Sequence, residues 1–342
     1  MRSLPSKLFK LKSYFYELPP GLVAMEPVAR RDKARLMVID RKEGTIRHDT
    51  FDHLNDHLPV NADLVVNNSK VIPARLLGHR ASGGEVEIFL LNPLEDGYLF
   101  EALLRPLKKI REGEAIDLGG GITAILENKE KRIVRFNKKN IVRHLEKIGH
   151  IPLPPYIKRP DTLQDRVDYQ TVYAKQPGSV ASPTAGLHFS KGSIKDLKKQ
   201  GHRFFELTLH INYGTFKPVE CDDIRQHPMH TEHFTVVPSV YEDISKAKKE
   251  GRPLIAVGTT SCRVLESAAQ TREYSGSTDI FIYPGFKFKA VDALITNFHL
   301  PNSTLLMLVC AFGGYDLIMK AYKEAIKERY RFYSYGDAML II

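Results

Sequence analysis

The segment Gly178–Phe189 reads Gly-Ser-Val-Ala-Ser-Pro-Thr-Ala-Gly-Leu-His-Phe and has neither a helical nor a strand period. The chain before it is rich in short strands, and the chain after it alternates strands with helices. Small side chains let a ligand or another backbone approach closely, and hydroxyls and an imidazole supply donors, acceptors and a titratable group. The segment is therefore either a tight connection that caps the next helix or part of a binding site. Four later stretches of similar composition favour the binding site.

Strands alternating with helices predict an α/β fold for most of the chain. A hairpin is expected at Leu36–Asp40 and Thr45–Phe51, and a buried strand at Asp63–Asn67. After His188, the expected strands are Arg203–Ile211, Pro253–Val257, Ile280–Tyr283, Asp292–Asn297 and a last strand that closes the chain. The expected helices are Ser193–Gln200, Ser239–Glu250 with a capping box of Ser239 and Glu242, Cys262–Gln270, Ser303–Phe312 and Asp316–Arg329.

Between about Leu76 and Gly149 the pattern changes to short, evenly spaced strands, which suggests a small barrel or sandwich. The expected strands are Val86–Leu91, Leu99–Leu104, Ala115–Leu118, Ile122–Leu126 and Ile133–Phe136, with Gly119–Gly121 as a hairpin turn. The proline-rich run Ile151–Arg159 cannot form a helix and reads as an extended return. The predicted fold is thus a discontinuous larger α/β domain, residues 1–75 and 152–342, with an inserted all-β, barrel-like domain at 76–151.

The composition is that of an ordinary globular protein with a basic excess. The 342 residues are 43% hydrophobic, and 50 Lys and Arg against 40 Asp and Glu give a net charge of +10. Such an excess either favours an anionic partner, most commonly nucleic acid, or serves solubility. The predicted insert is itself basic, so its rim could follow a phosphate backbone or be a solvated face.

Three cysteines, Cys221, Cys262 and Cys310, stand far apart, so neither a disulfide framework nor a cysteine zinc site is indicated. A reducing cytoplasm fits this pattern best. No run of 18 apolar residues occurs, and we expect no membrane span.

Three features carry candidate chemistry. The run Gly258–Ser261 lies between a buried strand and a helix, a geometry in which helix N–H groups bind an anion, although Thr and Ser often only cap the helix. His227, His230, Glu232 and His233 stand close together, but their spacing is not that of a zinc helix and Pro228 interrupts them. We expect a hydrogen-bonding cluster there and no metal. His188, His210 and His299 each adjoin Leu or Phe, so each is either a core residue or a site residue.

Several enzyme classes lack their usual motifs in this sequence. No nucleophile elbow, no Ser-x-x-Lys, no Cys beside a His and no G-x-G-x-x-G fingerprint occurs. Reasoning from the residues alone therefore ends at a basic two-domain enzyme with an unusual site of small and polar residues.

The chain closely resembles the QueA family, the S-adenosylmethionine:tRNA ribosyltransferase-isomerases of queuosine biosynthesis. The resemblance runs from about Glu17 to the C-terminus, and its motifs include Gly178–Phe189, Thr208–Val219, Gly258–Ser267 and Asp292–Phe312. Departures are mild: Ser182 stands where the family usually has Ala, and Asn302 where it usually has Lys.

The resemblance implies an enzyme that transfers the ribosyl part of S-adenosylmethionine to 7-aminomethyl-7-deazaguanine at the wobble position of a tRNA. Isomerisation to epoxyqueuosine accompanies release of adenine and methionine. Such a reaction needs a base for the acidic proton beside the sulfonium, a donor to the leaving adenine, and polar groups for the methionine carboxylate and ribose hydroxyls. S-adenosylmethionine would be a co-substrate without a metal, and the enzyme a cytoplasmic monomer. The alternatives are an S-adenosylmethionine-dependent tRNA methyltransferase and a non-catalytic nucleic-acid-binding protein.

The titratable candidates for catalysis are His188, His210, His230, Glu232, His299 and Asp337. The candidates for binding S-adenosylmethionine are Ser182, Thr184, Tyr213, Thr215, Gly258, Thr259, Thr260, Arg263, Asn297 and Ser303. We expect the active centre where five segments converge: Gly178–Phe189, Leu209–Phe216, His227–Glu232, Gly258–Arg263 and Thr296–Thr304. All five are poor in Lys, as a positively charged sulfonium substrate would require.

Overall fold

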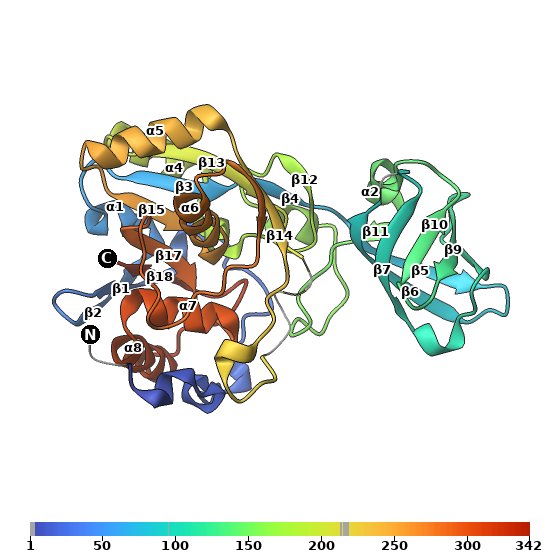
Figure 1. Cartoon of the computed structure of the whole chain (residues 1–342), viewed down its shortest axis with the longest axis horizontal. Coiled ribbons are helices and arrows are strands. Elements are labelled where there is room, and N and C mark those ends of the chain that lie inside the picture. The colour runs from blue at the N-terminus through green and yellow to red at the C-terminus, as the bar shows by residue number, and fades with distance from the viewer. Residues whose placement is uncertain (1–3, 95, 213, 215–218) are drawn as a thin grey trace. The chain divides into compact units, whose positions relative to one another are not determined.

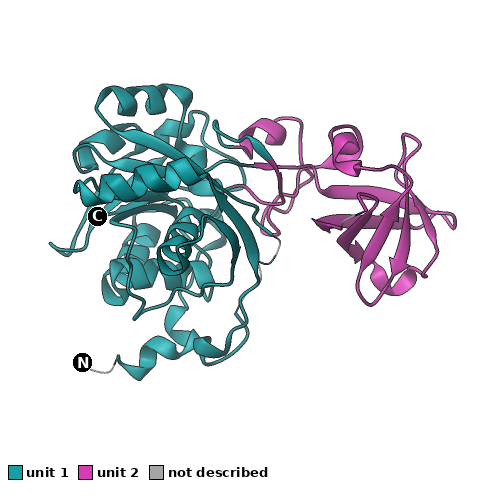
Figure 2. Cartoon of the chain, turned by 45° about the horizontal axis from the view of Figure 1, so that its top comes forward, with its two compact units in different colours: residues 1–69, 171–176, 183–342 teal, residues 70–170, 177–182 magenta. Residues whose placement is uncertain are grey.

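The computed structural model describes residues 4–94, 96–212, 214 and 219–342. The chain divides into two compact units (Figure 2). Unit 1 comprises residues 1–69, 171–176 and 183–342, and unit 2 comprises residues 70–170 and 177–182. The domain boundaries expected at 76 and 151 remain a prediction. The segment Gly178–Phe189 is shared between the two units, with its second half in unit 1.

In its described residues, unit 1 is built on a mixed sheet of nine strands (Figure 1). In spatial order they are β16 (Ser275–Thr278), β14 (Glu232–Val236), β13 (Arg203–Leu209), β3 (Asp63–Asn67), β15 (Leu254–Val257), β17 (Ala293–Asn297), β18 (Ala338–Ile341), β1 (Arg35–Asp40) and β2 (Thr45–Thr50). The central strands β13, β3, β15 and β17 run parallel, and β18 pairs antiparallel with β17. The central run Asp63–Asn67 is fully buried, as expected for a parallel strand covered on both faces.

Helices cover the sheet. They are α1 (Leu54–His57), α4 (Lys191–Lys199), α5 (Pro238–Lys249), α6 (Thr259–Thr271), α7 (Thr304–Gly313) and α8 (Tyr315–Lys327). The short 3-10 turn η8 (Thr184–His188) packs against β17, and α6 packs against β3, β13, β15 and β17. One core cluster gathers alternate strand residues such as Leu64, Val66 and Ile255 with Phe51 and Phe189. This period of two places the intervening residues on the opposite face of the sheet.

Three local expectations in unit 1 are wrong. Helix α6 begins at Thr259 instead of Cys262, because Gly258 adopts a φ of +90° and lets the chain turn directly from β15 into the helix. Helix α5 has no capping box: Val237 is its N-cap and Pro238 its first residue, since proline is favoured there. Residues 280–283 form no strand; β16 precedes them, and Ile280, Phe281 and Ile282 line a pocket.

The described part of unit 2 contains a closed barrel of six strands, which confirms the predicted barrel-like insert. The strands are β5 (Arg75–Arg80), β6 (Glu85–Pro93), β7 (Leu99–Arg105), β10 (Ile133–Phe136), β9 (Thr123–Asn128) and β8 (Ala115–Asp117), with β11 (Gly149–His150) added beside β5. Pairing of β5 with β8 closes the barrel. At Gly78 a Cβ would lie 2.6 Å from the carbonyl oxygen of Asp117, so the closure needs glycine there. A separate ladder joins β4 (Ser69–Val71) and β12 (Gln176–Ser179).

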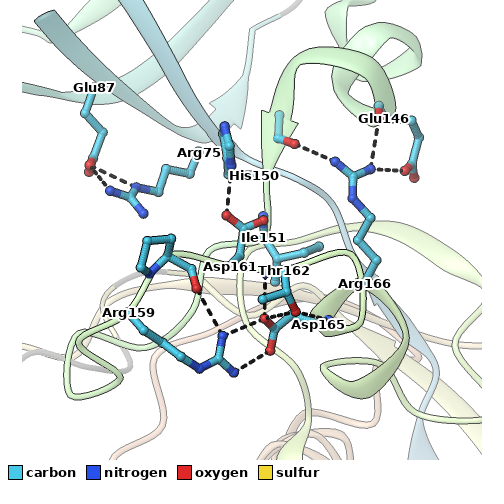
Figure 3. A network of polar contacts seen from close by, with 12 residues as sticks. Arg75, Glu87, Glu146, His150, Ile151, Arg159, Asp161, Thr162, Asp165 and Arg166 are labelled. Atoms are coloured by element: carbon cyan, nitrogen blue, oxygen red, sulfur yellow. Dashed lines mark hydrogen bonds and ion pairs between the residues drawn. The ribbon is translucent and has the colours of Figure 1, made fainter. Parts of the chain in front are cut away.

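A network of ion pairs holds the proline-rich return within unit 2 (Figure 3). Asp165 is buried on the short helix α3 (Asp165–Asp168) and binds both Nη atoms of Arg159, at 2.7 and 2.8 Å. Arg166 donates to the Gly149 carbonyl and to Glu146 of α2 (Leu145–Ile148). The return is thus fixed by side chains, because its prolines lack the N–H groups that a strand or helix would use.

Candidate active site

The candidate site lies at the carboxyl edge of the parallel strands. Strands β3, β13, β15 and β17 end at Asn67, Leu209, Val257 and Asn297, and each is followed by polar residues. Parallel strands present these ends at one edge of the sheet, which is where ligands bind in open α/β sheets. The buried Asn67 amide bridges to the Leu209 backbone and ties two of these strand ends together. The predicted segments Gly258–Arg263 and Thr296–Thr304 begin at these strand ends, and Leu209–Phe216 begins there as well, although its residues 213, 215 and 216 lie outside the described residues.

The Asn297 amide organises the first cluster of side chains. Its Nδ2 lies 3.1 Å from His188 Nε2 and 3.2 Å from the Tyr333 carbonyl oxygen. Its Oδ1 accepts a hydrogen bond from Thr184 Oγ1 at 3.0 Å. Since the amide nitrogen donates, Nε2 of His188 is the accepting nitrogen. The predicted residues Thr184, His188 and Asn297 thus form one hydrogen-bonded cluster, here called the His188 cluster.

His188 is a neutral imidazole. The residue is 4% exposed, and its ring packs against Phe51 with 5.1 Å between the centroids. Burial first, and then the positive charges of Arg31 and Arg331, lower the pKa of His188 to about 3. The ring therefore stays uncharged over the physiological pH range and can accept or donate hydrogen bonds.

Two further titratable candidates, His299 and Asp337, lie beside the His188 cluster. His299 Nε2 lies 2.7 Å from Thr296 Oγ1, and burial lowers the pKa of His299 to about 3. The Asp337 carboxylate accepts hydrogen bonds from the backbone N–H of Arg35 at 2.9 Å and of Arg331 at 2.7 Å. Burial raises the pKa of Asp337. Asp337 thereby fixes the backbone on which Arg331 approaches His188.

A second cluster lines a pocket at the start of α6, here called the α6 pocket, with an empty volume of about 640 Å³ including space open to solvent. Its lining includes the predicted residues His230, Glu232, Thr259, Thr260 and Arg263. The Glu232 carboxylate and Arg263 Nη1 form a buried ion pair. A Cβ at Gly258 would lie 3.7 Å from that of Ala185 in η8, so this helix start adjoins the His188 cluster.

The remaining predicted residues have different positions. Ser303 caps α7 by accepting a hydrogen bond from Leu306 N. His210 lines a separate groove along β13, with Nδ1 buried and without a partner among the described residues. Ser182 belongs to unit 2, and its buried hydroxyl likewise has no partner in the described part of the chain. Tyr213 and Thr215 lie outside the described residues.

The histidines near Glu232 point to different surroundings. His227 faces the Phe281 ring with 5.7 Å between centroids and lines the α6 pocket, whereas His233 is exposed on β14 and bonds Ser277 at 2.9 Å. Within residues 4–94, 96–212, 214 and 219–342, no group of three His, Cys, Asp or Glu is arranged to hold a metal ion. The expectation of no metal remains a prediction.

Sequence reasoning overlooked the groups that surround the polar residues. Arg31, Phe51 and Arg331 set the environment of His188, and Ile280, Phe281, Ile282, Leu305 and Leu308 form the apolar wall of the α6 pocket. Leu305 and Leu308 lie within the motif Asp292–Phe312 of the family resemblance, but nothing in the sequence indicated that they line a pocket. The groups of this set come together only in the tertiary fold.

In the described part of the chain, no single helix is long and apolar enough to cross a membrane. Helices α7 and α8 pass that test only as a pair, and they are bent by 116° at the break between them.

The α/β sheet with its β-barrel agrees with the family match. The family described as "Queuosine biosynthesis protein" matches residues 11–341, and the chain belongs to that family. It is 48% identical to the S-adenosylmethionine:tRNA ribosyltransferase-isomerase of Sulfurihydrogenibium sp., over 97% of this chain and 100% of the relative. It is 47% identical to the protein of that name from Thermotoga maritima, with the same coverage.

A solved structure supports the fold. The crystal structure of the S-adenosylmethionine tRNA ribosyltransferase from Thermotoga maritima aligns with a TM-score of 0.56 and 37% identity, covering 96% of this chain and all of that one. The predicted combination of a larger α/β part and a β-barrel is therefore confirmed.

Proposed function

We propose that this protein is an S-adenosylmethionine:tRNA ribosyltransferase-isomerase. It transfers and isomerises the ribosyl group of S-adenosylmethionine onto 7-aminomethyl-7-deazaguanine at the wobble position of tRNA, and it releases adenine and methionine. Relatives with this name are 47–48% identical over 97% of the chain. The reaction on tRNA takes place in the cytoplasm, and the enzyme works as a monomer.

One observation on the site carries this proposal. The described lining of the α6 pocket contains no lysine, and its one arginine, Arg263, is already paired with Glu232. An uncompensated cation would repel a sulfonium, whereas this lining does not. His188 and His299, both neutral, lie at the same strand edge and add no positive charge.

The product identifies the reaction. Purified protein incubated with S-adenosylmethionine and tRNA carrying the aminomethyl deazaguanine should release adenine and methionine in equal amounts and add mass to the tRNA. S-adenosylhomocysteine as the product would instead identify a methyltransferase. Absence of any product, with tRNA still bound, would identify a non-catalytic binding protein.

We propose that the 76–151 insert binds tRNA through basic residues at both ends of its barrel. Lys108 and Lys109 follow the end of β7 in η6 (Leu107–Lys109), and both are exposed. Lys138 and Lys139 follow β10, whose antiparallel pairing places its end beside the start of β7. The two lysine pairs therefore lie at opposite ends of β7, and each can contact a different stretch of phosphate backbone.

Changing Lys108, Lys109, Lys138 and Lys139 together to Glu should weaken tRNA binding strongly while leaving S-adenosylmethionine binding unchanged. Two double variants change one lysine pair each, either Lys108 and Lys109 or Lys138 and Lys139. Each should reduce the slope of log binding constant against log salt concentration by about 2, because each lysine that neutralises a phosphate contributes about 1 to that slope. Fluorescence anisotropy with labelled tRNA at several salt concentrations measures both quantities. Lys320→Glu with Lys323→Glu on α8 is the control for charge alone, because both are exposed. Equal weakening in the control and barrel variants would remove the barrel ends from the interface.

A further inference from the structure

The floor of the α6 pocket contains two buried polar groups that the fold leaves unsatisfied. Arg263 is 7% exposed: its Nη1 is paired with Glu232 and its Nε donates to the Ile280 carbonyl oxygen at 3.3 Å. Its Nη2 has no hydrogen-bond partner among the described residues. An orphaned guanidinium N–H in a buried position costs free energy, which a bound acceptor would recover.

Thr260 is the second group. The residue is 9% exposed, and its Oγ1 has no partner in the described part of the chain. The neighbouring Ser261 differs, since its Oγ donates to the Val257 carbonyl oxygen at 2.8 Å. Both unsatisfied groups line the pocket.

The helix start adds further donors to the same place. Helix α6 runs for 13 residues from Thr259, and its N-cap Gly258 has no side chain to accept the first backbone N–H groups. These groups, together with the positive end of the helix dipole, favour an anion. Arg263 Nη2, Thr260 Oγ1 and the N–H groups of the first turn are thus three kinds of donor, and Thr259, Thr260 and Arg263 all line the α6 pocket.

The remainder of the pocket is apolar and suits a thin, flexible thioether chain. Its walls are Met229, Ile280, Phe281, Ile282, Leu305 and Leu308. Sulfur makes favourable contacts with aromatic rings such as Phe281. The Glu232 carboxylate has about four acceptor sites, so it can hold an ammonium group while it accepts from Arg263.

The geometry points to the α6 pocket as the binding site for the methionine half of S-adenosylmethionine. The substrate carboxylate would accept hydrogen bonds from Arg263 Nη2 and Thr260 Oγ1. This assignment rests on the proposed function. The side chain lies along the apolar walls, and Glu232 faces the α-ammonium. Arg263 and Thr260 would then select the amino-acid end of the substrate, because a ligand without a carboxylate leaves both groups unsatisfied.

Decarboxylated S-adenosylmethionine tests this assignment, since it lacks only the carboxylate. Equilibrium binding to the wild-type protein should favour S-adenosylmethionine over the decarboxylated compound by ~10–100-fold, the effect of a buried charge-assisted hydrogen bond. Thr260→Val should weaken S-adenosylmethionine binding alone, and it keeps the fold because Oγ1 makes no hydrogen bond there. Ser261→Ala is the matched control, and it should leave the preference unchanged.

The role of Arg263 is tested in a variant that leaves no buried charge unpaired. Arg263→Gln in a Glu232→Gln background removes both members of the ion pair, and it should abolish the preference for the carboxylated ligand. Equal weakening of both ligands, or a wild-type protein that does not distinguish them, would overturn the assignment. L-Methionine should compete with S-adenosylmethionine for binding, and inorganic phosphate should not. Competition by phosphate and not by L-methionine would identify a phosphate-binding site and would also overturn the assignment.

These measurements are independent of the reaction. A wild-type protein that prefers the carboxylated ligand but produces S-adenosylhomocysteine would contradict the proposed function and support the assignment of the methionine-binding site. A protein that releases adenine and methionine without that preference would support the proposed function and contradict the assignment of the methionine-binding site.

Discussion

Replacing His188 with Ala should lower the rate of adenine release by ~100-fold or more, the usual scale for losing a group that transfers or shares a proton in the reaction. The imidazole is held by Asn297 and packs on Phe51, so its position is fixed before substrate binds. Single-turnover assays with saturating tRNA should place the loss in the chemical step, with S-adenosylmethionine affinity changed little.

The pH dependence shows which property of His188 matters. Burial and two nearby arginines lower the pKa of His188 to about 3, so the neutral form dominates at every pH above that value. His188→Gln should therefore reduce the height of the pH–rate profile without changing its shape between pH 5 and 9. Loss of an acidic limb near pH 6.5 in this variant would show that His188 titrates during turnover, and would contradict its assignment as a neutral partner.

His202 provides a matched control for this experiment. It is also buried, its pKa is also lowered by burial, and it accepts a hydrogen bond from the Ala62 backbone at 3.1 Å. His202 precedes β13, at the edge of the sheet opposite the site. His202→Ala should lower the melting temperature while the folded enzyme keeps its rate. A similar loss of rate in both variants would mean that the His188 effect arises from general destabilisation.

Much of the fold could be predicted from the sequence because its strongest signals are local. The buried run Asp63–Asn67 and the short strands from Val86 to Phe136 were predicted within a few residues of β3, β6, β7, β8, β9 and β10. Strand β5 was missed. Its Gly78 weakens a strand pattern, yet the fold needs glycine there because the backbone of Asp117 approaches so closely.

The site was predictable by residue type and less so by grouping. Polar residues after buried strands predicted that the candidate residues share one edge of the sheet, since parallel strands align their carboxyl ends. Which of these residues contact one another depends on strand order and helix packing, which the sequence does not display. His188 and Asn297 are 109 residues apart and share a hydrogen bond, whereas His210 faces a separate groove.

The apolar run Ile280–Tyr283 shows the same limit. Its β-branched and aromatic residues predicted a strand, yet three of them form the wall of the α6 pocket. Periodicity records that a side chain is buried and does not record what covers it.

Replacing Glu232 with Gln should have two effects, one on stability and one on rate. Glu232 is the first residue of β14, is 4% exposed, and is paired with Arg263. Removing its charge leaves the guanidinium buried without a counter-ion, which typically costs about 3–5 kcal/mol of folding free energy. The same change removes a carboxylate that we propose contacts the substrate, so adenine release should fall by ~100-fold or more in the fraction that remains folded.

Glu266 separates these two effects because it is a buried carboxylate on α6, the helix that carries Arg263, and its position is purely structural. Its oxygens accept hydrogen bonds from the backbone N–H groups of Lys289, Ala290 and Val291, at 2.8, 2.9 and 2.9 Å. Glu266→Gln should lower the denaturation midpoint without lowering the rate per folded molecule. Denaturant unfolding and single-turnover adenine release, measured on both variants, give the two quantities separately. If Glu232→Gln loses stability as Glu266→Gln does but releases adenine at the wild-type rate, Glu232 serves only as the partner of Arg263.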